Sequence, residues 1–147
     1  MNSYGLIDLH CDTLAEYWKY AHTGNPDTLD DPGRVLSLSN MPKDVHWAQF
    51  YAVFIPDEER GQAAIDYFEK NRANFYRQME KFGDRVAPCR NADDMEKAWA
   101  AGKTAAFLTI ENGSALAGDL SRVHTLAEQG VRAITLTWNG ENELGSG

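Results

Sequence analysis

The hydrophobic residues of this chain follow two periods, one typical of strands and one typical of helices. The segment HWAQFYAVFI (46–55) is apolar on both faces after Gln49, which predicts a buried strand of a parallel sheet. TAAFLTI (104–110) and VRAITLTW (131–138) have the same character and predict two further strands. YGLIDLH, near the start of the chain, predicts the first strand.

Helical segments separate these strands. Pro56 and Asp57 are expected to begin a long helix with acidic residues in its first turn, and Gly83 to end it. A shorter helix is expected within residues 91–102, and Gly130 closes a third. The apolar positions expected to face the core are Ile65, Phe68, Phe75, Met79 and Phe82 in the long helix and Leu120, Val123 and Ala127 in the third.

The beginning of the chain is less regular. Thr13 is expected to cap a short helix through LAEYWKYA (14–21). Residues 23–44 are expected to form a long surface loop, which is either a lid over a site or a solvated connection. The resulting order of elements predicts an α/β fold in which crossover helices join parallel strands.

Charge and cysteine content narrow the class of protein. With 14 Lys and Arg residues against 22 Asp and Glu, the net charge is −8, which argues against nucleic acid or an anionic membrane as a partner.

No apolar run approaches the ~18 residues of a membrane span, and no signal region follows Met1, so a cytoplasmic location is expected. Cys11 and Cys89 are expected to be buried thiols, with a catalytic thiol at Cys11 as the alternative.

Three ionisable residues occupy alternate positions in LIDLHCDTL (6–14), namely Asp8, His10 and Asp12. Strict alternation in a strand would place them on one face, and the apolar residues between them on the other, namely Ile7, Leu9 and Cys11. A charged face must meet water, partner charges or a metal ion. This strand is therefore either an exposed edge with a polar side or part of a site.

One further acid follows the end of a later predicted strand. Glu111 directly follows TAAFLTI. Ligands gather at the carboxyl ends of the strands in parallel α/β folds, so His10, Asp12 and Glu111 are expected to converge at one edge. An imidazole with two carboxylates suits zinc first, with manganese, iron or cobalt as alternatives. Glu111 could instead stabilise the start of the following helix.

The segment GLIDLHCDTL resembles the opening of the membrane (renal) dipeptidase family, zinc peptidases built on the amidohydrolase-like (β/α)8 barrel. Three later segments resemble the same family in order and spacing: HWAQFYAVFI, LTIENGSAL and GVRAITLTWNGENELGSG. The resemblance covers nearly the whole chain. It implies a hydrolase, a metallopeptidase that cleaves small dipeptides.

The resemblance also implies roles for individual residues. His10 and Asp12 would bind one zinc ion, and Glu111 would bridge that ion to a second and so act in catalysis. Asp8 would not bind metal, but a hydrogen bond from it would orient His10. Manganese, iron or cobalt could replace zinc.

Three residues after the last predicted strand are placed near the substrate by the same resemblance. Trp138 occupies a position where some family members have a histidine thought to touch the reacting centre, and an indole cannot carry a proton. Asn139 and Asn142 either line the substrate pocket or cap turns.

A (β/α)8 barrel needs about 250 residues. Residues 1–147 are therefore expected to be the N-terminal half of one such domain, inactive alone, with the C-terminal half absent. The expected partner is that remaining half or another copy of the chain, as in a homo-oligomer, because a half-barrel exposes sheet edges. Two alternatives stay open: a half-barrel that only assembles or binds, and a related amidohydrolase acting on lactones, cyclic amides or phosphoesters.

Overall fold

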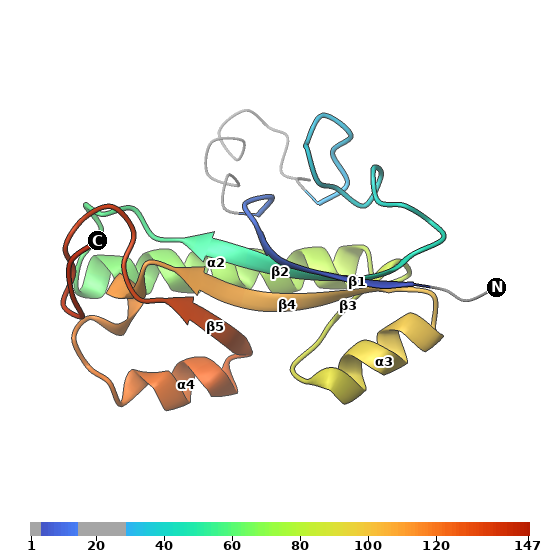
Figure 1. Cartoon of the computed structure of the whole chain (residues 1–147). Helices are drawn as coiled ribbons and strands as arrows, with labels where there is room; N and C mark the ends of the chain where they lie inside the picture. Colours follow the sequence, from blue (N-terminus) through green and yellow to red (C-terminus); the bar gives the residue numbers. More distant parts are fainter. Residues whose placement is uncertain (1–3, 15–28) are drawn as a thin grey trace.

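One parallel five-stranded sheet is the centre of the computed structural model, which describes residues 4–14 and 29–147 (Figure 1). The strands are β1 (Gly5–Cys11), β2 (His46–Phe54), β3 (Val86–Pro88), β4 (Thr104–Glu111) and β5 (Val131–Thr135). β1 pairs with β2, and β2 pairs with β4. Two strands pair with the other edge of β4: β3 pairs with the first residues of β4, and β5 pairs with its last residues. The predicted α/β fold with parallel strands is confirmed.

β2 and β4 form the buried middle of the sheet. Their register makes Phe54 the direct partner of Glu111 at the carboxyl ends of the two strands. Because successive side chains alternate between faces, Leu108 enters the main core while Phe107 belongs to a second apolar cluster on the other face. Glu111 shares the face of Phe107. The sheet therefore has one face that holds the main core and one face that carries the candidate ligand.

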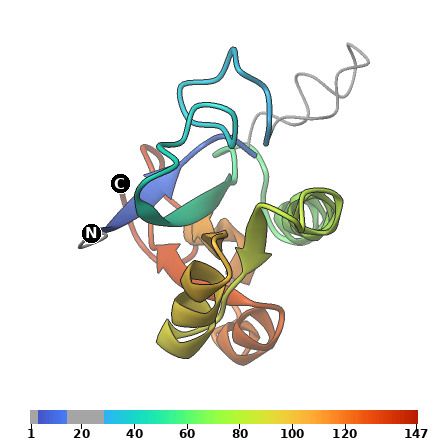
Figure 2. The ribbon, with the colours of Figure 1, turned by 90° about the vertical axis from the view of Figure 1, so that its right-hand side faces the viewer.

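The long helix α2 (Gln62–Lys81) covers the face of the main core (Figure 2). Its Phe68, Phe75 and Met79 are buried in that core, as the apolar spacing predicts. Each such side chain contributes about 1.5–3 kcal/mol when it leaves water. Ile65 and Phe82 are only half-buried. Burial of this helix face fixes α2 against the strands that carry the candidate site.

The start of α2 differs from the prediction. The helix was expected directly after Pro56 and Asp57, but Gly61 precedes it with φ of 54° and its first turn contains no acidic residue. A positive φ lies outside the right-handed helical region, so the helix cannot extend back through Gly61. Asp57 is also held elsewhere, because its carboxylate accepts a hydrogen bond from Asn112 Nδ2 at 3.1 Å.

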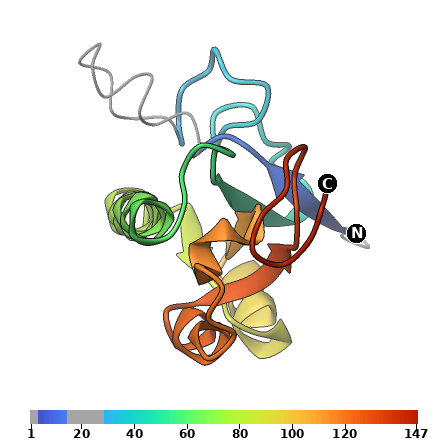
Figure 3. The same ribbon diagram turned by 90° about the vertical axis from the view of Figure 1, so that its left-hand side faces the viewer.

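The helix α3 (Ala92–Ala100) packs on the opposite face of the sheet (Figures 2 and 3). The helix predicted within residues 91–102 is confirmed, and Asn91 caps it, since its side chain accepts a hydrogen bond from the Asp94 N–H at 2.8 Å. Trp99 donates to the Trp47 carbonyl at 2.9 Å, near the amino end of β2. α3 therefore covers the amino-end part of the face that carries Glu111. β3, which precedes α3, is too short to predict from a period.

The last helix, α4 (Arg122–Glu128), is shorter than predicted. Its buried residue is Leu126, whereas Leu120 lies before the helix and is 67% exposed, and Val123 is 43% exposed. The predicted apolar stripe is therefore wrong. α4 has only seven residues and begins after Leu120, so the predicted stripe does not lie within one helix.

The connecting segments also refine the predictions. The predicted strand 131–138 ends at Thr135, and the chain then turns back across the carboxyl ends of the strands (Figure 1).

The described part of the predicted surface loop, residues 29–44, is called the early loop here. Its Leu36 carbonyl accepts a hydrogen bond from the Thr13 hydroxyl at 2.8 Å. The predicted helix through 14–21 lies outside the described residues apart from its first position. None of the helices in the described ranges is long and apolar enough to cross a membrane.

Candidate metal centre

The carboxyl end of β1 contains a bulge that decides where its side chains point. Asp8 pairs with Gln49 and Cys11 with Tyr51, so three steps along β1 oppose two steps along β2. The predicted strict alternation is therefore wrong at this point. Asp8 and Cys11 both lie toward the buried Tyr51, whose pKa is raised first by burial and further by these two neighbours. His10, within the bulge between Asp8 and Cys11, faces Glu111 instead.

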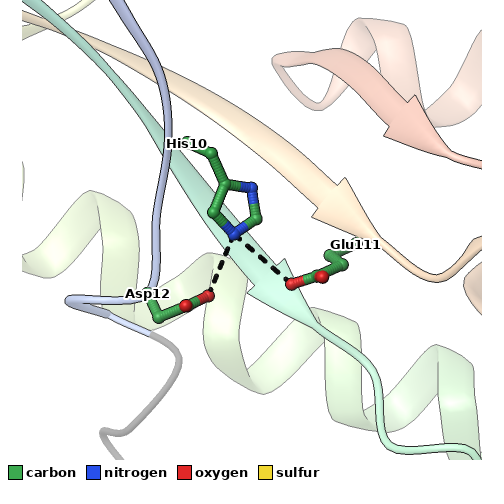
Figure 4. A group of neighbouring side chains, drawn as sticks. All are labelled: His10, Asp12 and Glu111. Carbon is green, nitrogen blue, oxygen red and sulfur yellow. Dashed lines mark ion pairs between the residues drawn. The ribbon is translucent and has the colours of Figure 1, made fainter. Parts of the chain in front are cut away.

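His10, Asp12 and Glu111 form the candidate metal centre (Figure 4). His10 Nε2 lies 3.3 Å from Asp12 Oδ1 and 3.5 Å from Glu111 Oε2. One ligand atom of each residue lies within 4.8 Å of the other two. β1 supplies His10, the residue after β1 supplies Asp12, and the last residue of β4 supplies Glu111. Two parallel strands on either side of β2 therefore bring together residues that are about a hundred positions apart in the sequence.

The spacing and chemistry of these atoms fit a divalent metal ion. Ligand atoms ~2.0–2.2 Å from a tetrahedral ion lie ~3.3–3.6 Å from one another. The distances from His10 Nε2 to the two carboxylates, 3.3 and 3.5 Å, fall in that range. A borderline ion accepts nitrogen and carboxylate oxygen together, so zinc suits this set of ligands.

Glu111 is the most enclosed of the three side chains. Its exposed fraction is 19%, compared with 47% for His10 and 59% for Asp12. Burial raises the pKa of Glu111, His10 acts to lower it, and the negative charge of Asp12 raises it again. Two carboxylates in a partly desolvated position repel each other, and a bound cation would relieve that repulsion. The electrostatics of the cluster therefore favour a cation.

Asp8 has a different contact from the one expected. Its carboxylate accepts a hydrogen bond from the main-chain N–H of His10 at 3.2 Å, and it does not reach the imidazole ring. The contact fixes the backbone of the bulge rather than the tautomer or rotation of the ring. Asp8 supports His10 through the main chain.

The Cys11 thiol is not suited to nucleophilic catalysis. Burial raises the pKa of this thiol to about 12, and the carboxylates of Asp8 and Asp12 add to the effect. A thiol with such a pKa is protonated near neutral pH, whereas the thiolate is the nucleophile. Cys89 is buried as well, and burial raises its pKa. Both residues are free thiols, and the alternative of a catalytic Cys11 is dropped.

A cleft of about 660 Å³ opens beside the candidate metal centre. His10 and Asp12 form one wall, and the early loop forms the other with Arg34 and Val35. Arg34 Nε lies 3.6 Å from Asp31 Oδ2, so this wall carries a charged pair. The described part of the predicted loop therefore borders the site, which favours a functional role for it over a solvated connection.

The three residues predicted near the substrate, Trp138, Asn139 and Asn142, differ in their burial and in their contacts. The Trp138 ring packs edge-on against Phe54, with ring centroids 4.8 Å apart, and 42% of the residue is exposed. Because Phe54 is the register partner of Glu111, this aromatic pair lies beside the candidate centre. Asn139 is exposed. Asn142 is buried and holds a turn, since its side chain accepts from the Leu144 N–H at 2.8 Å.

One residue that the sequence patterns do not single out is Asn112, directly after Glu111. It is fully buried and hydrogen-bonds with segments that follow three different strands. The available signal in the sequence is the Asn-Gly pair after a strand, which indicates a turn rather than a site.

Comparison with known proteins agrees with this geometry. The family model for "Membrane dipeptidase (Peptidase family M19)" matches residues 1–147. A solved dipeptidase of the same family is 19% identical, with a TM-score of 0.76 over 94% of this chain and 44% of that chain. A metallopeptidase from Rhodobacter sphaeroides, "liganded with phosphinate mimic of dipeptide L-Ala-D-Ala", is 17% identical, with a TM-score of 0.76 over 94% and 46% of the two chains.

A third solved structure matches a smaller part of this chain. An amidohydrolase from Pseudomonas aeruginosa is 24% identical, with a TM-score of 0.60, covering 71% of this chain and 30% of that chain. At such identities the solved structures show the shared fold. The chain spans less than half the length of each of these three structures.

Proposed function

Because this chain belongs to the membrane dipeptidase family (peptidase family M19), we propose that it supplies part of the active site of a metal-dependent dipeptidase. The observation that carries the proposal is the convergence of His10, Asp12 and Glu111, whose ligand atoms lie within 4.8 Å of one another. They meet at the carboxyl end of a parallel sheet, where barrel enzymes carry out their chemistry.

The proposed metal is zinc, with two ions in the complete site. His10 and Asp12 would hold one ion, and Glu111, with an oxygen for each, would bridge to the second. The family resemblance motivates this division, and the positions of the ligands support it, because His10 and Asp12 come from the end of β1 and Glu111 from the end of β4. A bound pair of ions would supply Lewis acidity toward the scissile carbonyl and lower the pKa of water.

The residues around the cluster would bind and orient the substrate. Phe54 and Trp138 form an apolar surface beside Glu111, while Arg34 borders the cleft on the opposite side of His10. A dipeptide carries two charged ends and variable side chains, so an apolar surface beside Glu111 together with a cleft that Arg34 lines suits it. The ligand of the R. sphaeroides relative motivates including dipeptides with a D-residue at the C-terminal position.

We further propose that additional strands complete a barrel around this sheet. β1 and β5 each have a partner on only one side among the described residues. Ile7 and Leu9 of β1 and Leu136 after β5 are exposed. Edges and apolar side chains of this kind favour association, so the remaining half-barrel or a second copy of the chain would cover them. The other metal ligands would come from that partner.

A related amidohydrolase activity is the second candidate. The similarity to the amidohydrolase from P. aeruginosa favours it, and a binuclear centre can hydrolyse lactones, cyclic amides or phosphoesters as well as peptides.

Metal analysis combined with a substrate panel tests the proposal. Purified full-length protein is analysed for metal content and assayed with L-Ala-D-Ala, L-Ala-L-Ala, a lactone, a cyclic amide and a phosphodiester. Two zinc ions and hydrolysis restricted to the dipeptides are expected. Metal with turnover of only the other substrates supports the second candidate, and metal-free protein without turnover refutes both.

A further inference from the structure

We propose that Asn112 is the positioning residue of the candidate metal centre, holding Glu111 in the orientation that binds metal. The inference rests on the proposed metal centre and adds a residue to it. Asn112 follows Glu111 directly, and the hydrogen bonds of its side chain go to residues outside the ligand set. Its effect would pass through the main chain that the two residues share.

The side chain of Asn112 uses both its donors and its acceptor. Nδ2 donates to the Ile55 carbonyl at 2.9 Å and to Asp57 Oδ1 at 3.1 Å, just beyond β2. Oδ1 accepts from Ser114 Oγ at 2.8 Å and from Asn142 Nδ2 at 2.9 Å, in the segment beyond β5. Asn112 thus connects the segments that follow β2, β4 and β5.

These bonds hold the main chain at the Glu111 carbonyl and at the residue that follows it. The Ile55 N–H donates to the Glu111 carbonyl at 2.9 Å, so Ile55 binds Glu111 through its amide and Asn112 through its carbonyl. Asn142 Nδ2 also donates to the Leu136 carbonyl at 2.7 Å, which ties β5 into the same network. Asn112 is fully buried and its side-chain polar groups are paired, so this network restricts the position of the main chain after Glu111.

The backbone of Asn112 gives a second reason for its identity. Its φ is 76°, a left-handed value that β-branched and bulky residues avoid and asparagine tolerates better than other side chains. Gly113 follows in the short 3-10 helix η1 (Gly113–Leu116), where a Cβ would lie 2.9 Å from the Leu136 carbonyl oxygen. The sharp turn after Glu111 therefore favours asparagine or glycine at position 112 and needs Gly113. Replacing Asn112 by Gly keeps the turn and removes the network.

Cobalt binding by the full-length protein tests the inference. Co²⁺ is titrated into metal-free wild type and Asn112→Gly, with its visible absorption reporting coordination geometry. Supporting groups of metal ligands typically contribute about 10–100-fold in affinity. We expect Asn112→Gly to weaken Co²⁺ binding at least tenfold and to change the absorption spectrum. Wild-type affinity with an unchanged spectrum in this variant would overturn the inference.

Two further variants separate positioning from stability. Asn91→Gly removes another asparagine cap, at α3, far from the centre, and should retain wild-type cobalt affinity even if the melting temperature falls. Asn112→Asp keeps the acceptor and tolerates the positive φ, but its second carboxylate oxygen replaces both donors and faces the Ile55 carbonyl and Asp57, so it should also weaken Co²⁺ binding at least tenfold. It also provides the test if Asn112→Gly does not fold. Equal weakening by Asn91→Gly would refute positioning.

Different results would refute the proposed substrate and the proposed role of Asn112. Protein that binds cobalt but cleaves no dipeptide refutes the substrate, and the comparison of Asn112 variants still decides the inference. Active enzyme in which Asn112→Gly binds cobalt normally refutes the inference alone.

Discussion

Asp30 and Arg85 form a bidentate ion pair, with Arg85 Nη1 and Nη2 lying 2.9 and 2.8 Å from the two carboxylate oxygens of Asp30. The pair ties the early loop to the residue before β3. Ser39 Oγ donates to the same carboxylate at 2.6 Å. Since this loop carries Arg34 and Val35 into the cleft, the ion pair holds one wall of the candidate site in place.

The first prediction concerns the pH dependence of this pair. The Arg85 hydrogen bonds lower the pKa of Asp30, with Ser39 contributing. A carboxyl whose pKa is lower in the folded state stabilises the protein above its unfolded pKa of ~3.9, and that stability is lost as the pH falls through the folded value. Asp30→Asn should therefore reduce the free energy of unfolding by about 1 kcal/mol at pH 7, because the pair is partly exposed.

Urea unfolding at pH 7 and at pH 3 checks this prediction. The difference between wild type and Asp30→Asn should shrink at pH 3, where the wild-type carboxyl begins to lose its charge. Glu96→Gln, at an exposed position of α3, should show no such pH-dependent difference. A difference for Asp30→Asn that stays constant over this range would contradict the assignment.

The second prediction separates a bridging ligand from a terminal one. Glu111→Ala should remove both metal ions from the full-length protein, whereas His10→Ala should remove one. Elemental analysis of dialysed protein measures the stoichiometry. Asp8→Asn is the control and should retain both ions, since Asp8 bonds to the main chain of His10. Two ions bound to the Glu111 variant would rule out the bridge.

The third prediction concerns the apolar surface beside the centre. Trp138→Ala should lower kcat/KM about tenfold for dipeptides with large apolar side chains, since lost apolar contacts are worth ~1–3 kcal/mol. The loss for a glycine-containing dipeptide should be smaller. Trp99→Phe, which changes a tryptophan at the other end of the sheet, should leave this selectivity unchanged. An equal loss for both kinds of substrate would mean that Trp138 does not contact the side chain.

The fourth prediction tests the main core. Phe68 is fully buried beneath the sheet, and Phe68→Ala should reduce the free energy of unfolding by about 3–5 kcal/mol because it removes apolar contacts and leaves a cavity. Val35→Ala, at a fully exposed position, should change it by less than ~0.5 kcal/mol. Chemical denaturation monitored by circular dichroism measures both. Similar values for the two variants would contradict the described core.

The sequence predicts those parts of the fold that depend on local periodicity. β2 and β4 are apolar on both faces, and the cap of α3 is a short-range bond between Asn91 and Asp94, so both are visible in a short window. The start of α2 and the bulge in β1 cannot be recognised in a short window of sequence. Gly61 changes the direction of the chain through one dihedral angle, and the bulge depends on pairing with β2.

The candidate site shows the same division. The convergence of His10, Asp12 and Glu111 was expected because strand ends meet at one edge, and the structure places these side chains together. Asn112 could not be found in this way. Its role depends on Ile55 and Asn142, which are distant in the sequence and come near it only in the folded chain.

The bulge in β1 has a consequence for how this strand can vary in length during evolution. Inserting or deleting a residue in a regular strand turns every later side chain to the opposite face. Here two residues, Leu9 and His10, already share the space opposite one residue of β2. A relative that lacks the residue at position 9 would lose the bulge and regain regular pairing, with its histidine still opposite the core. We therefore expect single-residue length differences among relatives to be tolerated at this point of β1 and excluded on either side of it.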